Sequence, residues 1–178
     1  MLFDLRTHSL RTISAGISGY FYGAAISKDG STVLFRNIPS SREAPARAYL
    51  YDVEDSNLGV LALPDNLQIP ERANIVDTFI SSTGRYVVLR ALWETNPGGD
   101  AEGLDEYQER LVWIDRQAER YEIILPNILS DANPFITPLG VTPDQEYFIV
   151  HYTNSVGDPN ISHTVAARFD NPVFQEIS

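Results

Sequence analysis

The hydrophobic positions of this chain fall into short runs that recur in the same order three times. Each copy has an apolar run, a tight turn, a second apolar run, a long polar loop, a third run that ends in Asp, and a fourth run after a short turn. The turns that align the copies begin at Ser27, Ser81 and Thr142. Runs rich in Tyr, Val, Ile and Phe between turn residues are typical of half-buried strands. The pattern therefore predicts an all-β fold of repeated four-stranded units.

The strands of each unit are named A to D in chain order. In the first unit they are expected at residues 22–26, 31–35, 47–51 and 58–63. In the second unit they are expected at residues 76–80, 85–92, 110–114 and 121–125. In the third unit they are expected at residues 139–141, 146–152, 163–169 and 173–177. A short apolar run ending at Asp4 and a second at residues 10–14 match strands C and D alone. The chain is thus expected to be one region with a half unit at 1–14 and full units at about 20–64, 76–126 and 138–178.

The turn residues support this assignment. The A–B turns contain Asp29-Gly30, Thr83-Gly84 and Asp144-Gln145, where glycine or a residue that tolerates positive φ suits a tight hairpin. Ser27, Ser81 and Thr142 are placed to bond the local backbone. We expect the acids that end strand C to accept hydrogen bonds from the C–D turn; these are Asp52, Asp115 and Asp170.

The first unit resembles a known repeat. Ser27-Lys28-Asp29-Gly30, the run at 32–35 and Ala48-Tyr49-Leu50-Tyr51-Asp52 are similar to the TolB-type β-propeller repeat, which is related to WD40 and PD40-like blades. Thr142-Pro143-Asp144 keeps the Pro-Asp of that repeat, whereas the second unit keeps only Ser81 and Gly84. The resemblance implies a β-propeller with about three and a half blades in this chain. It implies little about activity, because propellers have many functions.

Three and a half blades do not close a ring, since propellers have about 4–8 blades. The open blade faces would expose apolar surface and strand edges to water. We expect either that the chain is a fragment of a larger propeller or that it self-associates, and the first interpretation is favoured because no spare A–B strand pair exists in the sequence.

Composition narrows the classes of partner. Thirteen Lys and Arg against 24 Asp and Glu give a formal charge of −11, which disfavours nucleic acid and anionic lipid. The chain has no cysteine, so it has neither disulfides nor thiolate sites. The N-terminal residues lack an export signal, and no apolar run approaches the length of a membrane-spanning helix. We expect a soluble protein with no membrane or nucleic-acid role.

Catalytic and metal-binding patterns are not found. The serine run around Ser14 and Ser18 lacks the Gly-x-Ser-x-Gly elbow, and His8, His151 and His163 lack metal-type spacing. No catalytic residue, cofactor or metal site is therefore assigned. Carboxylate pairs for glycoside hydrolysis are defined by separation in space, so the sequence leaves them open.

Recognition is expected on the face formed by the long B–C loops, at about residues 36–46, 93–109 and 153–162, because variable loops on a rigid rim commonly bind partners. The second loop carries the binding candidates, which are Trp93, Asp100, Glu102, Asp105, Glu106 and Tyr107. We expect the carboxylates to form a solvated acidic insertion; the alternatives are that they ligate a cation such as calcium or attract a basic partner. The sequence thus predicts a non-catalytic module for a protein or peptide partner. The alternative is the propeller domain of a hydrolase whose catalytic part lies outside this chain.

Overall fold

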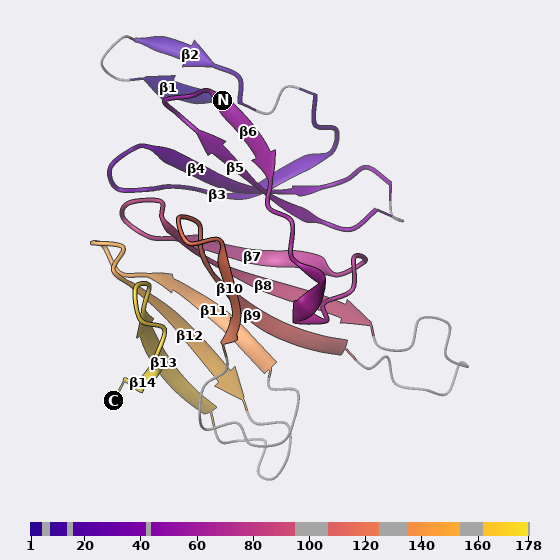
Figure 1. Ribbon diagram of the computed structural model, residues 1–178, viewed down its shortest axis with the longest axis vertical. Coiled ribbons are helices and arrows are strands. Elements are labelled where there is room, and N and C mark those ends of the chain that lie inside the picture. The colour runs from indigo at the N-terminus through magenta and orange to yellow at the C-terminus, as the bar shows by residue number, and fades with distance from the viewer. Residues whose placement is uncertain are drawn as a thin grey trace.

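The structure is a computed structural model, and it describes residues 1–4, 8–13, 16–41, 44–94, 107–124, 135–153 and 162–177. Within these residues the strands form one two-stranded hairpin and three four-stranded antiparallel sheets (Figure 1). The N-terminal hairpin is β1 (Leu2–Asp4) and β2 (Ser9–Arg11). The first sheet is β3 (Tyr20–Ile26), β4 (Thr32–Ile38), β5 (Arg47–Asp52) and β6 (Asn57–Val60). The second sheet is β7 (Asn74–Ile80), β8 (Tyr86–Glu94), β9 (Tyr107–Asp115) and β10 (Arg120–Ile124). The third sheet is β11 (Phe135–Val141), β12 (Tyr147–Thr153), β13 (Ser162–Arg168) and β14 (Gln175–Glu176).

The strands of each sheet pair in chain order, so each sheet is a meander, as the repeat predicts. A 3-10 helix, η1 (Asp65–Leu67), lies in the connection between the first and second sheets. Several loop boundaries differ from the expectation, since β4 continues to Ile38 and β9 begins at Tyr107. Trp93 was expected to open the second B–C loop, but β8 continues through it and pairs Trp93 with Gln108 of β9. The register continues because the alternation of buried and half-buried side chains persists along β8.

The sheets stack one on another (Figure 1). The core lies between them, because their apolar faces pack together. Between the first and second sheets, Leu34 and Ala48 pack against Ile75, Val87 and Leu89. Alternate residues of a strand point to opposite faces, so Val88 of β8 packs on the other side. There it joins a second core of residues that includes Trp113, Phe148, Val150 and Phe169. The second sheet is therefore covered on both faces.

The A–B turns adopt the conformation that their residues predict. Gly30, Gly84 and Gln145 have φ of 75°, 70° and 58°. The hydroxyl that precedes each turn also bonds the backbone, since the amides of Thr32, Tyr86 and Tyr147 donate to Ser27 Oγ, Ser81 Oγ and Thr142 Oγ1 at 3.0, 3.0 and 3.1 Å. Serine and threonine thus fix the start of strand B in all three sheets.

The same turns connect neighbouring sheets. The backbone amide of Asp29 donates to the carbonyl of Ser82, and the amide of Ser82 donates to the carbonyl of Gln145, each at 3.1 Å. The three A–B turns consequently meet at one end of the molecule, where the first strands of the sheets converge.

The acids that end strand C follow the expectation in two sheets. Asp52 Oδ1 accepts from the amides of Glu54 and Asp55 at 3.1 and 3.2 Å, and Asp115 Oδ1 accepts from the amides of Gln117 and Ala118 at 3.1 and 3.3 Å. In the third sheet Asp170 pairs with Arg168 at 2.9 Å. The difference is one of position, because Asp52 and Asp115 are the last residues of β5 and β9, whereas Asp170 lies two residues after the end of β13.

Candidate functional site

The predicted binding residues fall into two groups. Asp100, Glu102, Asp105 and Glu106 lie outside the described residues, whereas Trp93 and Tyr107 lie within them. Trp93 is 8% exposed and its indole belongs to the core between the first and second sheets. Tyr107, the first residue of β9, is 45% exposed. Of these two aromatic residues, Tyr107 is therefore the more exposed.

Trp93 and Tyr107 line one small pocket. The pocket has a volume of about 180 Å³, and its other lining residues are Arg72, Asn74, Leu92 and Glu94. It lies where β8 ends at Glu94 and β9 begins at Tyr107, which is the base of the second B–C loop.

Polar contacts hold the rim of the pocket in place. The Tyr107 hydroxyl donates to Glu94 Oε1 at 3.1 Å, and Arg72 Nη2 donates to the Glu94 carbonyl at 3.0 Å. The guanidinium carbon of Arg110 lies 5.9 Å from the centre of the Trp93 ring, within cation–π range. Glu94 thus connects the exposed tyrosine of β9 to an arginine of the connection that precedes β7.

Arg72, Asn74 and Glu94 were missed at the sequence level. Glu94 adjoins Trp93 in sequence, but nothing marks Arg72 or Asn74, since both lie outside the long loops. Asn74, the first residue of β7, lies at the loop base because it pairs with Leu92 of β8, and its Oδ1 accepts from the amide of Ala46, just before β5 of the first sheet, at 2.9 Å. The pairing of β7 with β8 and the path of the connection before β7 bring these groups together.

A second polar cluster joins the second and third sheets. Arg90 of β8 pairs with Asp77 of β7 and with the buried Glu109 of β9, each at 2.9 Å. The other oxygen of Glu109, Oε2, accepts from the backbone amide of Ile136 in β11 at 3.1 Å. Because each carboxylate already has a partner, we assign the cluster a structural role.

The histidines for which the structure gives contacts bond within the third sheet. His151 Nδ1 lies 3.2 Å from Thr164 Oγ1, and His163 Nδ1 lies 2.8 Å from Glu176 Oε1. The His163 ring also stacks on Tyr152, with ring centres 5.1 Å apart. These contacts tie β12, β13 and β14 together.

Asp115 is paired with an arginine that lowers the pKa of its carboxyl group. Arg85 donates to both of its oxygens, at 2.9 Å from Nε and 2.6 Å from Nη2. Hydrogen bonding by the Arg85 guanidinium holds the pKa of Asp115 below its ordinary value, with further lowering from the turn amides and an opposing effect of burial. Asp115 therefore stays ionised while it fixes the C–D turn.

Solved structures share this stack of meanders. The tricorn protease aligns with a TM-score of 0.59 at 13% identity, over 93% of this chain and 15% of that chain. Pyrococcus horikoshii acylaminoacyl peptidase aligns with a TM-score of 0.55 at 12% identity, over 89% of this chain and 25% of that chain. The β-propeller domain of the Trilobed protease from Pyrococcus furiosus aligns with a TM-score of 0.50 at 11% identity, over 89% of this chain and 43% of that chain.

This chain has the fold of a partial β-propeller. It spans 15% to 43% of the length of the three structures above. No protein-family model matches it, and no curated protein matches it. In the part of the chain that the structure describes, no helix has the length and apolarity needed to cross a membrane. The fold expectation from the sequence is confirmed, and the similarity at these identities concerns fold alone.

Proposed function

We propose that this propeller region is a non-catalytic binding module that recognises a protein or peptide partner at the base of its second B–C loop. The observation that carries the proposal is the arrangement of Tyr107, Glu94 and Arg72 around the edge of Trp93. An exposed tyrosine held by a hydrogen bond loses little conformational freedom when a partner binds, which favours affinity.

The charge of the chain supports a basic partner. Four carboxylates occur within residues 100–106, directly before Tyr107, and the formal charge of the chain is −11. A field of this sign steers a cationic segment toward the loop and raises its association rate, with a strong dependence on salt. The pocket volume of about 180 Å³ suits one partner side chain.

The test uses immobilised peptides of matched length, one set rich in Lys and Arg and the other rich in Asp and Glu. We expect the chain to bind members of the basic set at low salt and the acidic set not at all. Tyr107→Ala should weaken that binding about tenfold, or about 1.4 kcal/mol. Changing Asp100 and Asp105 to Asn, and Glu102 and Glu106 to Gln, should reduce its salt dependence.

The matched control is Tyr20→Ala, since Tyr20 is also an exposed tyrosine but lies on β3 of the first sheet. It should leave binding unchanged. Equal binding by wild type and Tyr107→Ala, or an equal loss with Tyr20→Ala, would count against the proposed site.

A second candidate function is that of a propeller domain attached to a hydrolase. It is favoured by the identity of the matched proteins, which are two proteases and a peptidase, and by the fact that this chain aligns with only 15% to 43% of their length. Under this candidate, the reading frame around residues 1–178 encodes an α/β-hydrolase domain with a Gly-x-Ser-x-Gly elbow. Flanking sequence with no such domain would reject it.

A further inference from the structure

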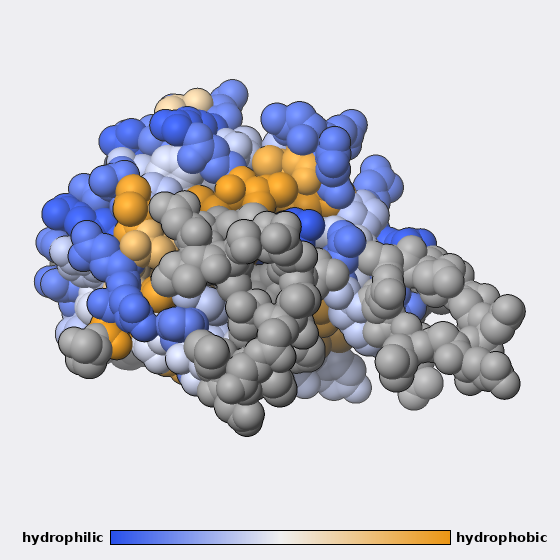
Figure 2. Space-filling view, turned by 90° about the horizontal axis from the view of Figure 1, so that it is seen from below, coloured by the Kyte–Doolittle hydropathy of each residue, from blue (hydrophilic) through white to orange (hydrophobic). Residues whose placement is uncertain are grey.

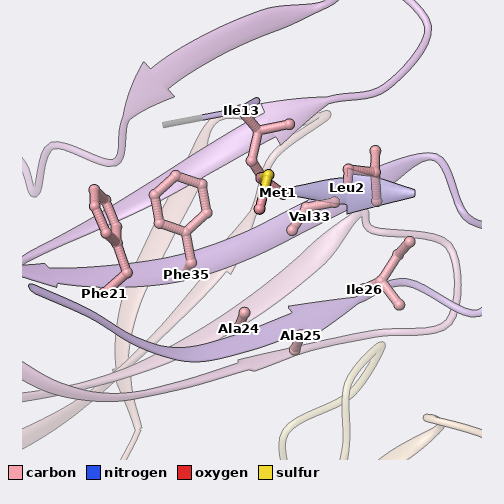
Figure 3. Close-up of a pocket in the computed structure, with 9 residues that line it drawn as sticks. All are labelled: Met1, Leu2, Ile13, Phe21, Ala24, Ala25, Ile26, Val33 and Phe35. Atoms are coloured by element: carbon pink, nitrogen blue, oxygen red, sulfur yellow. The ribbon is translucent and has the colours of Figure 1, made fainter. Parts of the chain in front are cut away.

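The first sheet has an apolar groove on the face that the N-terminal hairpin only partly covers. The groove has a volume of about 320 Å³ and lies between β1 and strands β3 and β4 (Figure 3). Its walls include Leu2, Phe21, Ile26, Val33 and Phe35. Phe21 is 41% exposed and Ile26 is 44% exposed. A large apolar surface is therefore open to solvent at the start of the stack.

The equivalent surface of the second sheet is covered, and it shows which elements cover it. Alignment of the turns at Ser27 and Ser81 makes Ile26 and Val33 equivalent to Ile80 and Val87. These two residues are buried, in a core to which Leu34 of β4 and Ala25 of β3 contribute. Strands A and B of the preceding sheet, which form an antiparallel hairpin, thus cover this surface of the second sheet.

The third sheet repeats the arrangement. Phe148 and Val150 of β12 occupy the positions equivalent to Val33 and Phe35 when the turns at Ser27 and Thr142 are aligned. Both are fully buried against the second sheet, where Val88 of β8 and Phe79 of β7 contact the same core. An A–B hairpin again contributes to the cover.

The N-terminal hairpin supplies only part of such a cover. Leu2 and Ile13 pack beside Val33 and Phe35, while Arg11 of β2 donates to Tyr51 Oη at 3.0 Å and to Ser56 Oγ at 2.8 Å. These bonds hold the hairpin over β5 and the turn that follows it. Among the described residues β1 pairs with β2 alone, so the other edge of β1 has no strand partner.

We propose that the groove binds a β-hairpin of a separate polypeptide, with one of its strands hydrogen-bonded to the free edge of β1. Aliphatic side chains of that hairpin point toward Phe21, Val33 and Phe35, as Leu34 and Val88 point toward the sheets that follow them. Main-chain bonds to an exposed strand edge together with apolar side chains in a groove are an established way of recognising an extended segment. This site is distinct from the loop-base pocket and does not depend on it.

A second copy of this chain does not suit the groove. The three A–B hairpins within the described residues, β3–β4, β7–β8 and β11–β12, are already paired with the C strands of their own sheets. Two copies also carry a formal charge of −11 each, which opposes their association at low salt. The partner hairpin is therefore expected to come from a neutral or basic protein.

The experiment uses a synthetic hairpin with the sequence of residues 74–92, which reproduces the cover that the second sheet provides. Cysteines at the paired positions of Asn74 and Leu92 close it with a disulfide. A fluorescent label on this probe reports binding to the 178-residue chain by anisotropy. We expect saturable binding and a higher unfolding temperature of the chain when the probe is present.

Variants of the chain locate the binding. Ile26→Asp and Phe21→Asp should each weaken binding about tenfold or more, or by about 1.4 kcal/mol at least, because they place a charge in the groove. Ala24→Gln, which puts a larger uncharged side chain on the groove wall, should also weaken it. Leu139→Asp is the control, because Leu139 is a similarly exposed apolar residue on β11 of the third sheet. It should bind the probe as wild type does. Circular dichroism and cooperative unfolding establish that each variant is folded.

Several results would overturn the proposal. They are absence of saturation at the highest soluble probe concentration, unchanged affinity of the folded Ile26→Asp and Ala24→Gln variants, and equal binding of a probe in which Phe79 and Val88 are both changed to Asp. Sedimentation velocity of the chain alone tests the other occupant. Self-association that disappears in Ile26→Asp would show that a second copy fills the groove.

Discussion

The side-chain amide of Gln145 donates to the backbone carbonyl of Ile26 at 3.0 Å, which joins residues 119 positions apart. Gln145 lies in the A–B turn of the third sheet and Ile26 ends the first strand of the first sheet. The bond therefore connects two sheets that are separated in the stack by the second sheet. It adds a direct bond between the first and third sheets at the place where the A–B turns meet.

Replacing Gln145 by Glu should destabilise the fold. The change keeps the size of the side chain but removes the donor and places a carboxylate against the Ile26 carbonyl. We expect the free energy of unfolding to fall by about 1–2 kcal/mol in urea titrations near neutral pH. Gln117→Glu adds the same charge at an exposed position and should change it little; an equal effect of both variants would show that the bond contributes nothing.

The glycines of the first two A–B turns should differ in their tolerance of alanine. A Cβ at Gly84 would lie 2.5 Å from Thr32 Oγ1 and 2.8 Å from Thr32 Cβ, whereas a Cβ at Gly30 would meet nothing within 4 Å. Both positions have positive φ, so both variants carry the backbone cost of about 1 kcal/mol. Gly84→Ala should cost about 1–3 kcal/mol more because of the contact with Thr32.

Denaturant midpoints of the two alanine variants measure this difference. Gly30→Val adds a β-branched side chain at positive φ and should lower the midpoint as well. Equal midpoints for Gly30→Ala and Gly84→Ala would mean that the first and second sheets adjust at Thr32 without cost.

Asp115 should give the stability of the fold an acid-dependent component. Its pKa is lowered in the folded state by Arg85, so its contribution is present above the unfolded-state pKa of about 3.9 and is lost as pH falls through the lower folded-state value. Urea titrations from about pH 5 to below about pH 3 should show a smaller loss of stability in Asp115→Asn than in wild type. Asp55→Asn, which changes an exposed carboxylate in the first C–D turn, is the control and should keep the wild-type slope.

Substitution of Trp93 should affect the stability of the fold, whereas substitution of Tyr107 should affect binding. Trp93 is buried between the first and second sheets, so Trp93→Ala should lower the free energy of unfolding by about 3–5 kcal/mol. Tyr107→Ala should change it by about 0.5 kcal/mol or less while weakening binding of the basic peptides. A large loss of stability in Tyr107→Ala, measured by urea titration, would show that this residue supports the fold instead.

Local chemistry explains why so much of the architecture was predictable. A strand needs only alternating or continuous apolar residues and a turn at each end, and an A–B turn needs a residue that accepts positive φ, so Gly30 and Gly84 could be located directly. The hydroxyls of Ser27 and Ser81 act within five residues of themselves. The A–B turns of the first two sheets were thus located correctly, although β7 begins two residues earlier and β8 ends two residues later than expected.

The candidate site was harder to predict because its residues come from separate elements. Trp93 was expected on the rim, yet its position in β8 points it into the core between sheets. Arg72 reaches the site from the connection before β7, and its relation to Glu94 depends on how that connection folds back over the second sheet. No spacing in the sequence encodes a contact of this kind.

The residues that are exposed on the open faces of the stack were identified only by the tertiary structure. The third sheet, at the far end from the N-terminal hairpin, exposes Leu139, Val173 and Ile177, and Figure 2, viewed from that end, shows apolar residues among hydrophilic ones on this side of the molecule. The repeat predicted that both ends would be uncovered. The structure located the groove at Phe21 and Ile26 and the exposed side chains of the third sheet.

The sequence by itself determined the strands, the turns and their order, because each depends on the pattern and conformational preferences of neighbouring residues. Tertiary structure decided which side chains are buried between sheets, which polar groups meet at the loop base, and where the first sheet remains uncovered. These features depend on packing between residues far apart in the chain. Gln145 and Ile26, which are 119 positions apart in the sequence and bonded in the structure, show how far that dependence extends.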